Sequence, residues 1–156
     1  MSAPRRTLGL GAISGLRSLS GLAFVCHAAS RGRLDLGGTP LAFLSSPRLA
    51  KAALVMALGE AVGDKLPMAP SRTSLPPLLG RAASGAVVGA ALFTSDGRRA
   101  ATGAALGSSA AVAASFTGER LRSLVGASTG LPEPIVALAE DATVLFVGLR
   151  SLRNVR

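Results

Sequence analysis

The sequence is poor in aromatic residues: it has no tryptophan and no tyrosine, and aromatics make up 3% of its 156 residues. Proteins that bind nucleic acids gather Lys and Arg on one face, often beside aromatic side chains on which bases stack. The formal net charge here is +9, but the basic residues stand mainly between apolar runs, as they do in membrane proteins. We therefore do not expect nucleic acid to be a partner.

Cysteine and histidine are equally scarce. The single cysteine, Cys26, excludes an internal disulfide, and with the neighbouring His27 it supplies too few ligands for a zinc site. The chain also lacks a phosphate-binding GxxxxGK loop and a serine–histidine–acid set with a supporting motif. The sequence thus predicts no metal site, no cofactor and no enzymatic activity.

Charged residues are few for a soluble protein. They make up 16% of the chain, compared with about 25% in typical soluble domains. Hydrophobic residues reach 49%, and the mean hydropathy is +0.47. A chain of this length holds one domain with a proper core. We therefore expect residues 1–156 to form a single integral membrane domain, with the lipid bilayer as its main partner.

Five segments are candidates for crossing a bilayer, which takes about 20 mainly apolar residues. They are residues 7–30, 49–66, 77–95, 100–117 and 134–149. A soluble bundle would need an amphipathic outer face, and these segments leave almost none. The predicted fold is all-α, a polytopic transmembrane helical bundle with some short or broken segments. The first segment imitates a secretion signal, but it is long for one and carries Arg17 near its centre, so we do not expect cleavage.

The orientation in the membrane does not follow from five crossings. One side would hold seven basic residues: Arg5, Arg6, Lys65, Arg72, Arg81, Arg120 and Arg122. The other side would hold nine: Arg31, Arg33, Arg48, Lys51, Arg98, Arg99, Arg150, Arg153 and Arg156. Seven against nine is too even for the positive-inside rule to decide.

Glycines recur at four-residue spacing in the first four segments. The pairs are Gly11 and Gly15, Gly59 and Gly63, Gly85 and Gly89, and Gly103 and Gly107. Small residues at this spacing let helix backbones approach closely in lipid. They predict a tight bundle, with residues 100–117 at its centre or at the interface of a homo-oligomer. Compositional bias towards glycine and alanine would produce the same pattern.

Acidic residues inside apolar segments are the least expected feature. Glu60 and Asp64 are four residues apart, which places both on one helix face, where they repel unless a cation or a proton lies between them. Glu140 and Asp141 interrupt the last segment and diverge by about 100° around a helix. A charge at bilayer depth normally faces a partner or water. The available counter-charges are Arg17, Lys65, Arg72 and Arg81.

The motifs around these acids resemble those of a known family. Glu60-x-x-x-Asp64-Lys65-Leu66-Pro67, followed by a proline-bearing loop, is similar to the hallmark of the bacterial membrane proteins grouped as domain of unknown function 4126. Thr129–Pro134 with Glu140–Asp141 is similar to that family's second motif, and Gly15–Ser18 to a first-helix motif. The Asn-Pro of longer members is absent, with Arg17–Ser18 in its place. The resemblance implies a multi-pass protein of the bacterial inner membrane and implies no activity.

Two functions remain open. In the first, the protein is a small transporter or channel-like protein for a proton, a cation or a small solute, and the acids line its pathway. In the second, it is a membrane scaffold or accessory subunit whose charges are structural ion pairs. In both, we expect one polar cluster inside the bundle and at one mouth, formed by Arg17, Glu60, Asp64, Lys65, Arg72, Glu140 and Asp141.

Overall fold

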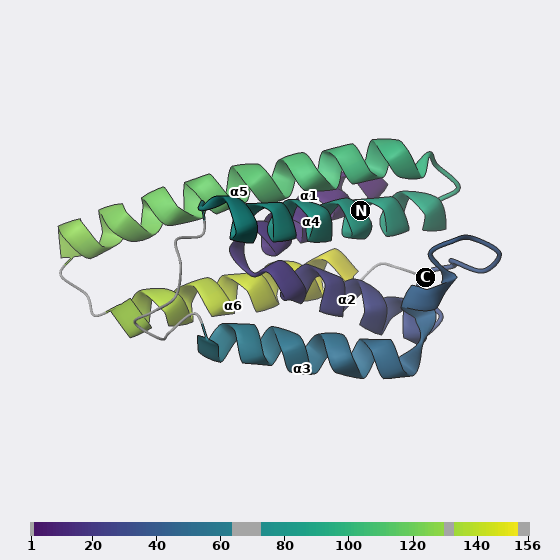
Figure 1. Ribbon diagram of the computed structural model, residues 1–156, viewed down its shortest axis with the longest axis horizontal. Coiled ribbons are helices and arrows are strands. Elements are labelled where there is room, and N and C mark those ends of the chain that lie inside the picture. The colour runs from purple at the N-terminus through teal and green to yellow at the C-terminus, as the bar shows by residue number, and fades with distance from the viewer. Residues whose placement is uncertain (1, 64–72, 130–132, 153–156) are drawn as a thin grey trace.

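The computed structural model describes residues 2–63, 73–129 and 133–152, and every regular element in these ranges is helical (Figure 1). The elements are α1 (Ala3–Leu16), α2 (Ser18–Ser30), the short 3-10 helix η1 (Ala42–Ser45), α3 (Pro47–Gly63), α4 (Leu75–Ser95), α5 (Ala100–Thr129) and α6 (Glu133–Leu152). The all-α prediction is confirmed. The prediction for the fourth segment was too short, since α5 continues from Thr117 to Thr129.

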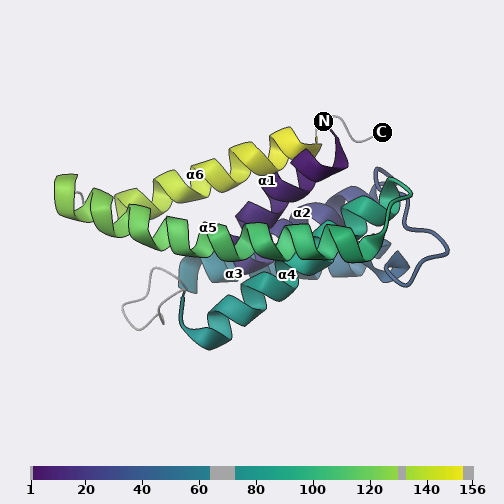
Figure 2. The same cartoon turned by 90° about the horizontal axis from the view of Figure 1, so that it is seen from above.

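The first predicted segment, residues 7–30, is not one helix. It is divided at Arg17, whose backbone is extended (φ −139°, ψ 105°), so that α1 ends and α2 begins there. The two helices then run in opposite directions (Figures 1 and 2). Gly21 of α2 lies directly against Ser14 and the Leu10 carbonyl of α1. We refer to residues 3–30 as the N-terminal hairpin, with Arg17 at its apex.

Helices α1, α4 and α5 pack through their backbones. A methyl group added at Gly89 of α4 would overlap the carbonyl oxygen of Gly103 in α5, and one added at Gly107 would overlap that of Gly85. A methyl group at Gly11 of α1 would likewise lie 2.8 Å from the Gly107 carbonyl oxygen. Only residues without a side chain permit such an approach. These three helices form the glycine layer of the molecule.

Helices α2, α3 and α6 pack more loosely. Helix α3 buries Ala50, Ala53 and Ala57. A methyl group at Gly59 or Gly63 would meet no described atom within 4 Å. The close packing expected at this glycine pair is therefore not met, because α3 uses its alanines for contact. Large apolar side chains of α3 and α6 remain exposed: Leu54, Val55, Met56, Leu58 and Val62 on α3, and Ile135, Leu138, Leu145, Phe146 and Leu149 on α6.

One of the described helices, α4, has the length and apolar composition needed to cross a membrane. Its best window has a mean hydropathy of 1.3, and 39% of that window is buried inside the protein. Together with the division of the first segment at Arg17, this leaves one candidate span by composition where the sequence predicted five crossings.

Candidate functional site at the apex of the N-terminal hairpin

The apex lies inside the protein. Arg17 is 1% exposed, although the chain on both sides of it consists of helix ends. The end of α1 leaves carbonyl groups without intrahelical partners, and the start of α2 leaves N–H groups without them. The first carry partial negative charge and the second partial positive charge. Buried groups of this kind need partners from other elements.

Glu60 of α3 supplies the partner for the start of α2. One of its carboxylate oxygens, Oε1, accepts hydrogen bonds from the Ser18 N–H at 2.7 Å and the Ser18 hydroxyl at 2.6 Å. The other, Oε2, accepts from the Leu19 N–H at 2.9 Å. A carboxylate at the positive end of a helix is in the favourable position. Glu60 is therefore the cap of a helix that begins 42 residues earlier in the chain.

Helices α4 and α5 supply the partners for the end of α1. The Gly15 carbonyl oxygen accepts hydrogen bonds from Arg81 Nη1 and from the Ser115 hydroxyl, both at 3.0 Å. The Ser84 hydroxyl of α4 donates to the Ser18 carbonyl. Arg81 is 4% exposed, so its cation lies buried beside the negative end of α1. The interruption between α1 and α2 is thus stabilised by contacts from α3, α4 and α5.

The two adjacent acids of α6 turn to different partners. Asp141 Oδ1 lies 2.7 Å from Arg17 Nη2 at the hairpin apex. Glu140 forms an ion pair with Arg122 of α5. Neighbouring residues of a helix point about 100° apart, so Asp141 links α6 to the hairpin apex and Glu140 links it to α5. The expected pairing of Arg17 with an acidic residue of an apolar segment is present in the structure.

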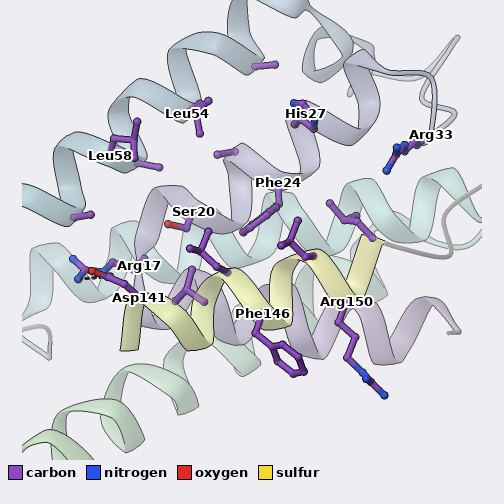
Figure 3. Close-up of a pocket in the computed structure, with 18 residues that line it drawn as sticks. Arg17, Ser20, Phe24, His27, Arg33, Leu54, Leu58, Asp141, Phe146 and Arg150 are labelled. Carbon is purple, nitrogen blue, oxygen red and sulfur yellow. Dashed lines mark ion pairs between the residues drawn. The ribbon is translucent and has the colours of Figure 1, made fainter. Parts of the chain in front are cut away.

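A cavity of about 910 Å³ lies between α2, α3 and α6 (Figure 3). The ion pair of Arg17 and Asp141 lies at one end, and His27 and Arg33 lie towards the other. The side chain of Asp141 is 22% exposed, whereas that of Arg17 is 1% exposed. The rest of the lining is mostly apolar: Ser20, Ala23, Phe24, Ala50, Leu54, Ala57, Leu58, Ala61, Val144, Leu145, Phe146, Leu149, Arg150 and Leu152. The carboxylate therefore faces an apolar groove, while its arginine lies behind it.

The predicted polar cluster is present only in part. Arg17, Glu60 and Asp141 meet at the apex, whereas Glu140 faces Arg122. The other three predicted members, Asp64, Lys65 and Arg72, lie outside the described residues.

Sequence reasoning missed the serines and Arg122. Ser18, Ser84 and Ser115 hold the apex, yet they cannot be told from the many other small residues in apolar segments. Arg81 carried a usable signal, because it is the seventh residue of α4 and therefore lies too deep to be a simple end residue. A second ion pair outside the predictions joins Arg6 to both carboxylate oxygens of Asp96, at 2.6 and 2.7 Å.

The chemistry available at the apex is that of ion pairs and helix ends. Within the described part of the chain, no group of three His, Cys, Asp or Glu residues could hold a metal ion. At the end of the groove, Arg17 can exchange the Asp141 carboxylate for another anion. That exchange is a step of binding and release.

Comparison with known proteins gives one match. Residues 6–153 match the model of the family described as Domain of unknown function (DUF4126). No curated protein and no solved structure matches the chain. The matched range contains the hairpin apex, all residues that hold it and the whole lining of the groove. The resemblance inferred from the motifs is confirmed, and the chain belongs to the DUF4126 family.

Proposed function

We propose that the protein is a polytopic protein of the bacterial cytoplasmic membrane, in which α3, α4, α5 and α6 cross the bilayer. At 1.5 Å per residue, helices of 17, 21, 30 and 20 residues are about 25 to 45 Å long, against about 30 Å of hydrocarbon. Exposed apolar side chains of α3 and α6 that lie outside the groove support this placement, since lipid would cover them: Val55, Met56, Val62, Ile135 and Leu138. The buried Arg17 and Arg81 have the partners that charges at bilayer depth require.

Within the membrane, the proposed function is transport of a small solute through the groove. One observation carries it: the ion pair of Arg17 and Asp141 closes one end of a groove that ends at a break between two helices. Transporters place their binding sites at such breaks, because helix ends offer charge and free backbone groups there. Irregular backbone at membrane depth is tolerated where it is buried in protein or lines a cavity.

The charges of the groove favour an anionic solute over a cation. Its lining contains three arginines, Arg17, Arg33 and Arg150, and one acid, Asp141. An anion that approaches Arg17 can take the place of the Asp141 carboxylate, and the apolar walls suit an apolar body. The preferred solute is therefore amphipathic, with one negative group.

The test uses the two adjacent acids as a matched pair. Asp141→Asn and Glu140→Gln each remove one carboxylate from an arginine, but only Asp141 lines the groove. Proteoliposomes loaded with octanesulfonate, a permanently charged amphipathic anion, report its release, and a pH-sensitive dye reports proton flux. We expect release by the wild type and by Glu140→Gln. In Asp141→Asn, release slows by about tenfold or more, because Arg17 then holds the anion without a competitor.

A neutral substitution supports the same test. Ala61→Phe narrows the groove without changing a charge and should also slow release, while leaving the ion pair intact. Release no faster than from protein-free liposomes, or equal release by the wild type and all variants, would contradict transport of this class of solute.

A scaffold role has one observation in its favour. Glu60 caps α2 and Glu140 pairs with Arg122, so two of the predicted acids already have structural tasks. If this is the whole function, Asp141→Asn and Glu140→Gln should both lower thermal stability in detergent without affecting any flux. The search would then turn to partner proteins.

A further inference from the structure

The N-terminal hairpin changes the distribution of charge along the molecule. A single helix over residues 7–30 would carry Arg5 and Arg6 to the side opposite Arg31. In the structure, α1 runs towards the apex and α2 runs back (Figures 1 and 2). Arg6 contacts Asp96, directly after the end of α4, and Gly9 lies against Ser151 near the end of α6. The start of α1 and the end of α2 are therefore at the same end of the bundle.

This end collects most of the basic residues. It contains the start of α1, residues 31–46, the start of α3, the turn between α4 and α5, and the end of α6. Nine basic residues belong to it: Arg5, Arg6, Arg31, Arg33, Arg48, Lys51, Arg98, Arg99 and Arg150. All of them except Arg6 are exposed. We refer to this set as the basic end.

The opposite half of the bundle has far fewer. Among the described residues it contains four basic side chains: Arg17, Arg81, Arg120 and Arg122. Arg81 is buried against Gly15, and Arg122 is paired with Glu140. Among the described residues the comparison is thus nine against four, whereas five straight crossings would divide them five against seven, with Arg17 inside the first segment. Short segments rich in Lys and Arg next to membrane spans stay on the cytoplasmic side.

The hairpin itself is too short to cross. Helices of 14 and 13 residues are about 21 and 20 Å long, against about 30 Å of hydrocarbon. Both legs start or finish at the basic end, and their shared apex is buried among α3, α4, α5 and α6.

We propose that the basic end is the cytoplasmic face of the protein, lying against the anionic headgroups of the inner leaflet, and that residues 3–30 enter the membrane from that face and return to it. This inference rests on the proposed membrane location. Ser2, residues 31–46 and the turn at Asp96–Arg99 are then cytoplasmic, and the far end of α5 is periplasmic. The negative surface potential of the cytoplasmic leaflet attracts the exposed arginines of the basic end.

Single cysteines test this arrangement in the full-length protein. Cys26 is buried, and Cys26→Ala provides the background. Ser2→Cys and Pro40→Cys place thiols on exposed residues of the basic end, and Ala127→Cys places one near the exposed far end of α5. Intact spheroplasts are treated with a membrane-impermeant maleimide before and after lysis. We expect Ala127→Cys to react in intact spheroplasts, and Ser2→Cys and Pro40→Cys to react only after lysis.

Other patterns would overturn the proposal in distinct ways. Reaction of Ser2→Cys from outside while Pro40→Cys stays protected would mean that residues 7–30 cross the membrane. Protection of Ala127→Cys together with outside reaction of both others would mean the opposite orientation. Extraction of the membranes with alkaline carbonate provides the separate readout for the proposed location. Release of the protein into the supernatant would contradict membrane integration itself.

Discussion

The two halves of the molecule use apolar residues in opposite ways. In the glycine layer, α1, α4 and α5 touch through backbone atoms at Gly85, Gly89, Gly103 and Gly107. Between α2, α3 and α6, bulky side chains such as Phe24 and Leu54 keep the helices apart and leave a cavity of about 910 Å³. Backbone contact leaves no room for a ligand, whereas side chains of different sizes around a gap do. The closely packed helices hold one side of the hairpin apex, and the helices around the cavity offer the candidate site.

The hairpin apex joins these halves. Helix α1 belongs to the glycine layer and α2 forms part of the groove, so Arg17 stands where one kind of packing gives way to the other. The partners of the apex come from both: Arg81 and Ser115 from the glycine layer, and Glu60 and Asp141 from the helices around the groove. Substitutions in the two halves and at the apex should therefore change the free energy of unfolding by different amounts.

The largest effect is expected in the glycine layer. Gly89→Val places a branched side chain where even a methyl group overlaps the Gly103 carbonyl oxygen. Because backbone cannot move aside as a side chain can, we expect a loss of about 3 kcal/mol or more in the free energy of unfolding. The measurement is thermal unfolding in detergent, where this corresponds to a drop of about 10 °C. An unchanged unfolding temperature would mean that α4 and α5 are not in backbone contact.

A smaller loss is expected at the apex from Glu60→Ala. The Ser18 and Leu19 N–H groups lose a charged acceptor at the start of α2, which should cost about 2 kcal/mol. Glu60→Gln keeps an acceptor oxygen and should recover part of this loss. Equal stability of the alanine variant and the wild type would show that the cap is not formed.

A substitution at the end of the groove should change the free energy of unfolding less than it changes the affinity for an anion. Asparagine keeps the shape of the Asp141 side chain and an oxygen that accepts a hydrogen bond from Arg17, so Asp141→Asn should cost about 1 kcal/mol. The same variant should raise the affinity for octanesulfonate, because no carboxylate then competes for Arg17. The measurement is isothermal titration in detergent. The control, Glu140→Gln, should leave that affinity unchanged. An equal change of affinity in both variants would show that the anion does not bind in the groove.

The smallest effect, and one of opposite sign, is expected at Gly59. A methyl group there meets no described atom within 4 Å, and alanine forms helix more readily than glycine. Gly59→Ala should therefore raise the free energy of unfolding by about 0.5 to 1 kcal/mol. In the same unfolding assay, a loss as large as that of Gly89→Val would show that α3 has a close contact with a second copy or another partner.

The sequence was sufficient for the segments that depend on apolar runs alone. The last four predicted segments correspond to helices α3 to α6, because long apolar stretches with no proline beyond the first turn favour helix. The pairing of Arg17 with a carboxylate was also predictable, since a charge in an apolar segment needs a partner. The contacts at Gly85, Gly89, Gly103 and Gly107 follow the same kind of local rule.

The break at Arg17 could not be found in this way. Leu16 and Arg17 favour helix by their own propensity, and neither proline nor a glycine with positive φ marks the position. The groups that stabilise the extended residue come from Glu60, Arg81 and Ser115, which are distant in sequence. The spacing of Glu60 and Asp64 was equally uninformative about Glu60, because its partners lie in α2 and not on its own helix face.

The separation of these partners along the chain also sets an order of assembly. Gly15 is synthesised 66 residues before Arg81 and 100 residues before Ser115. While the ribosome is still translating α4, the turn at Arg17 lacks the hydroxyl donor that α5 will bring. Residues 3–30 are thus made well before their last partner, and their final shape depends on a helix that is synthesised about 100 residues later.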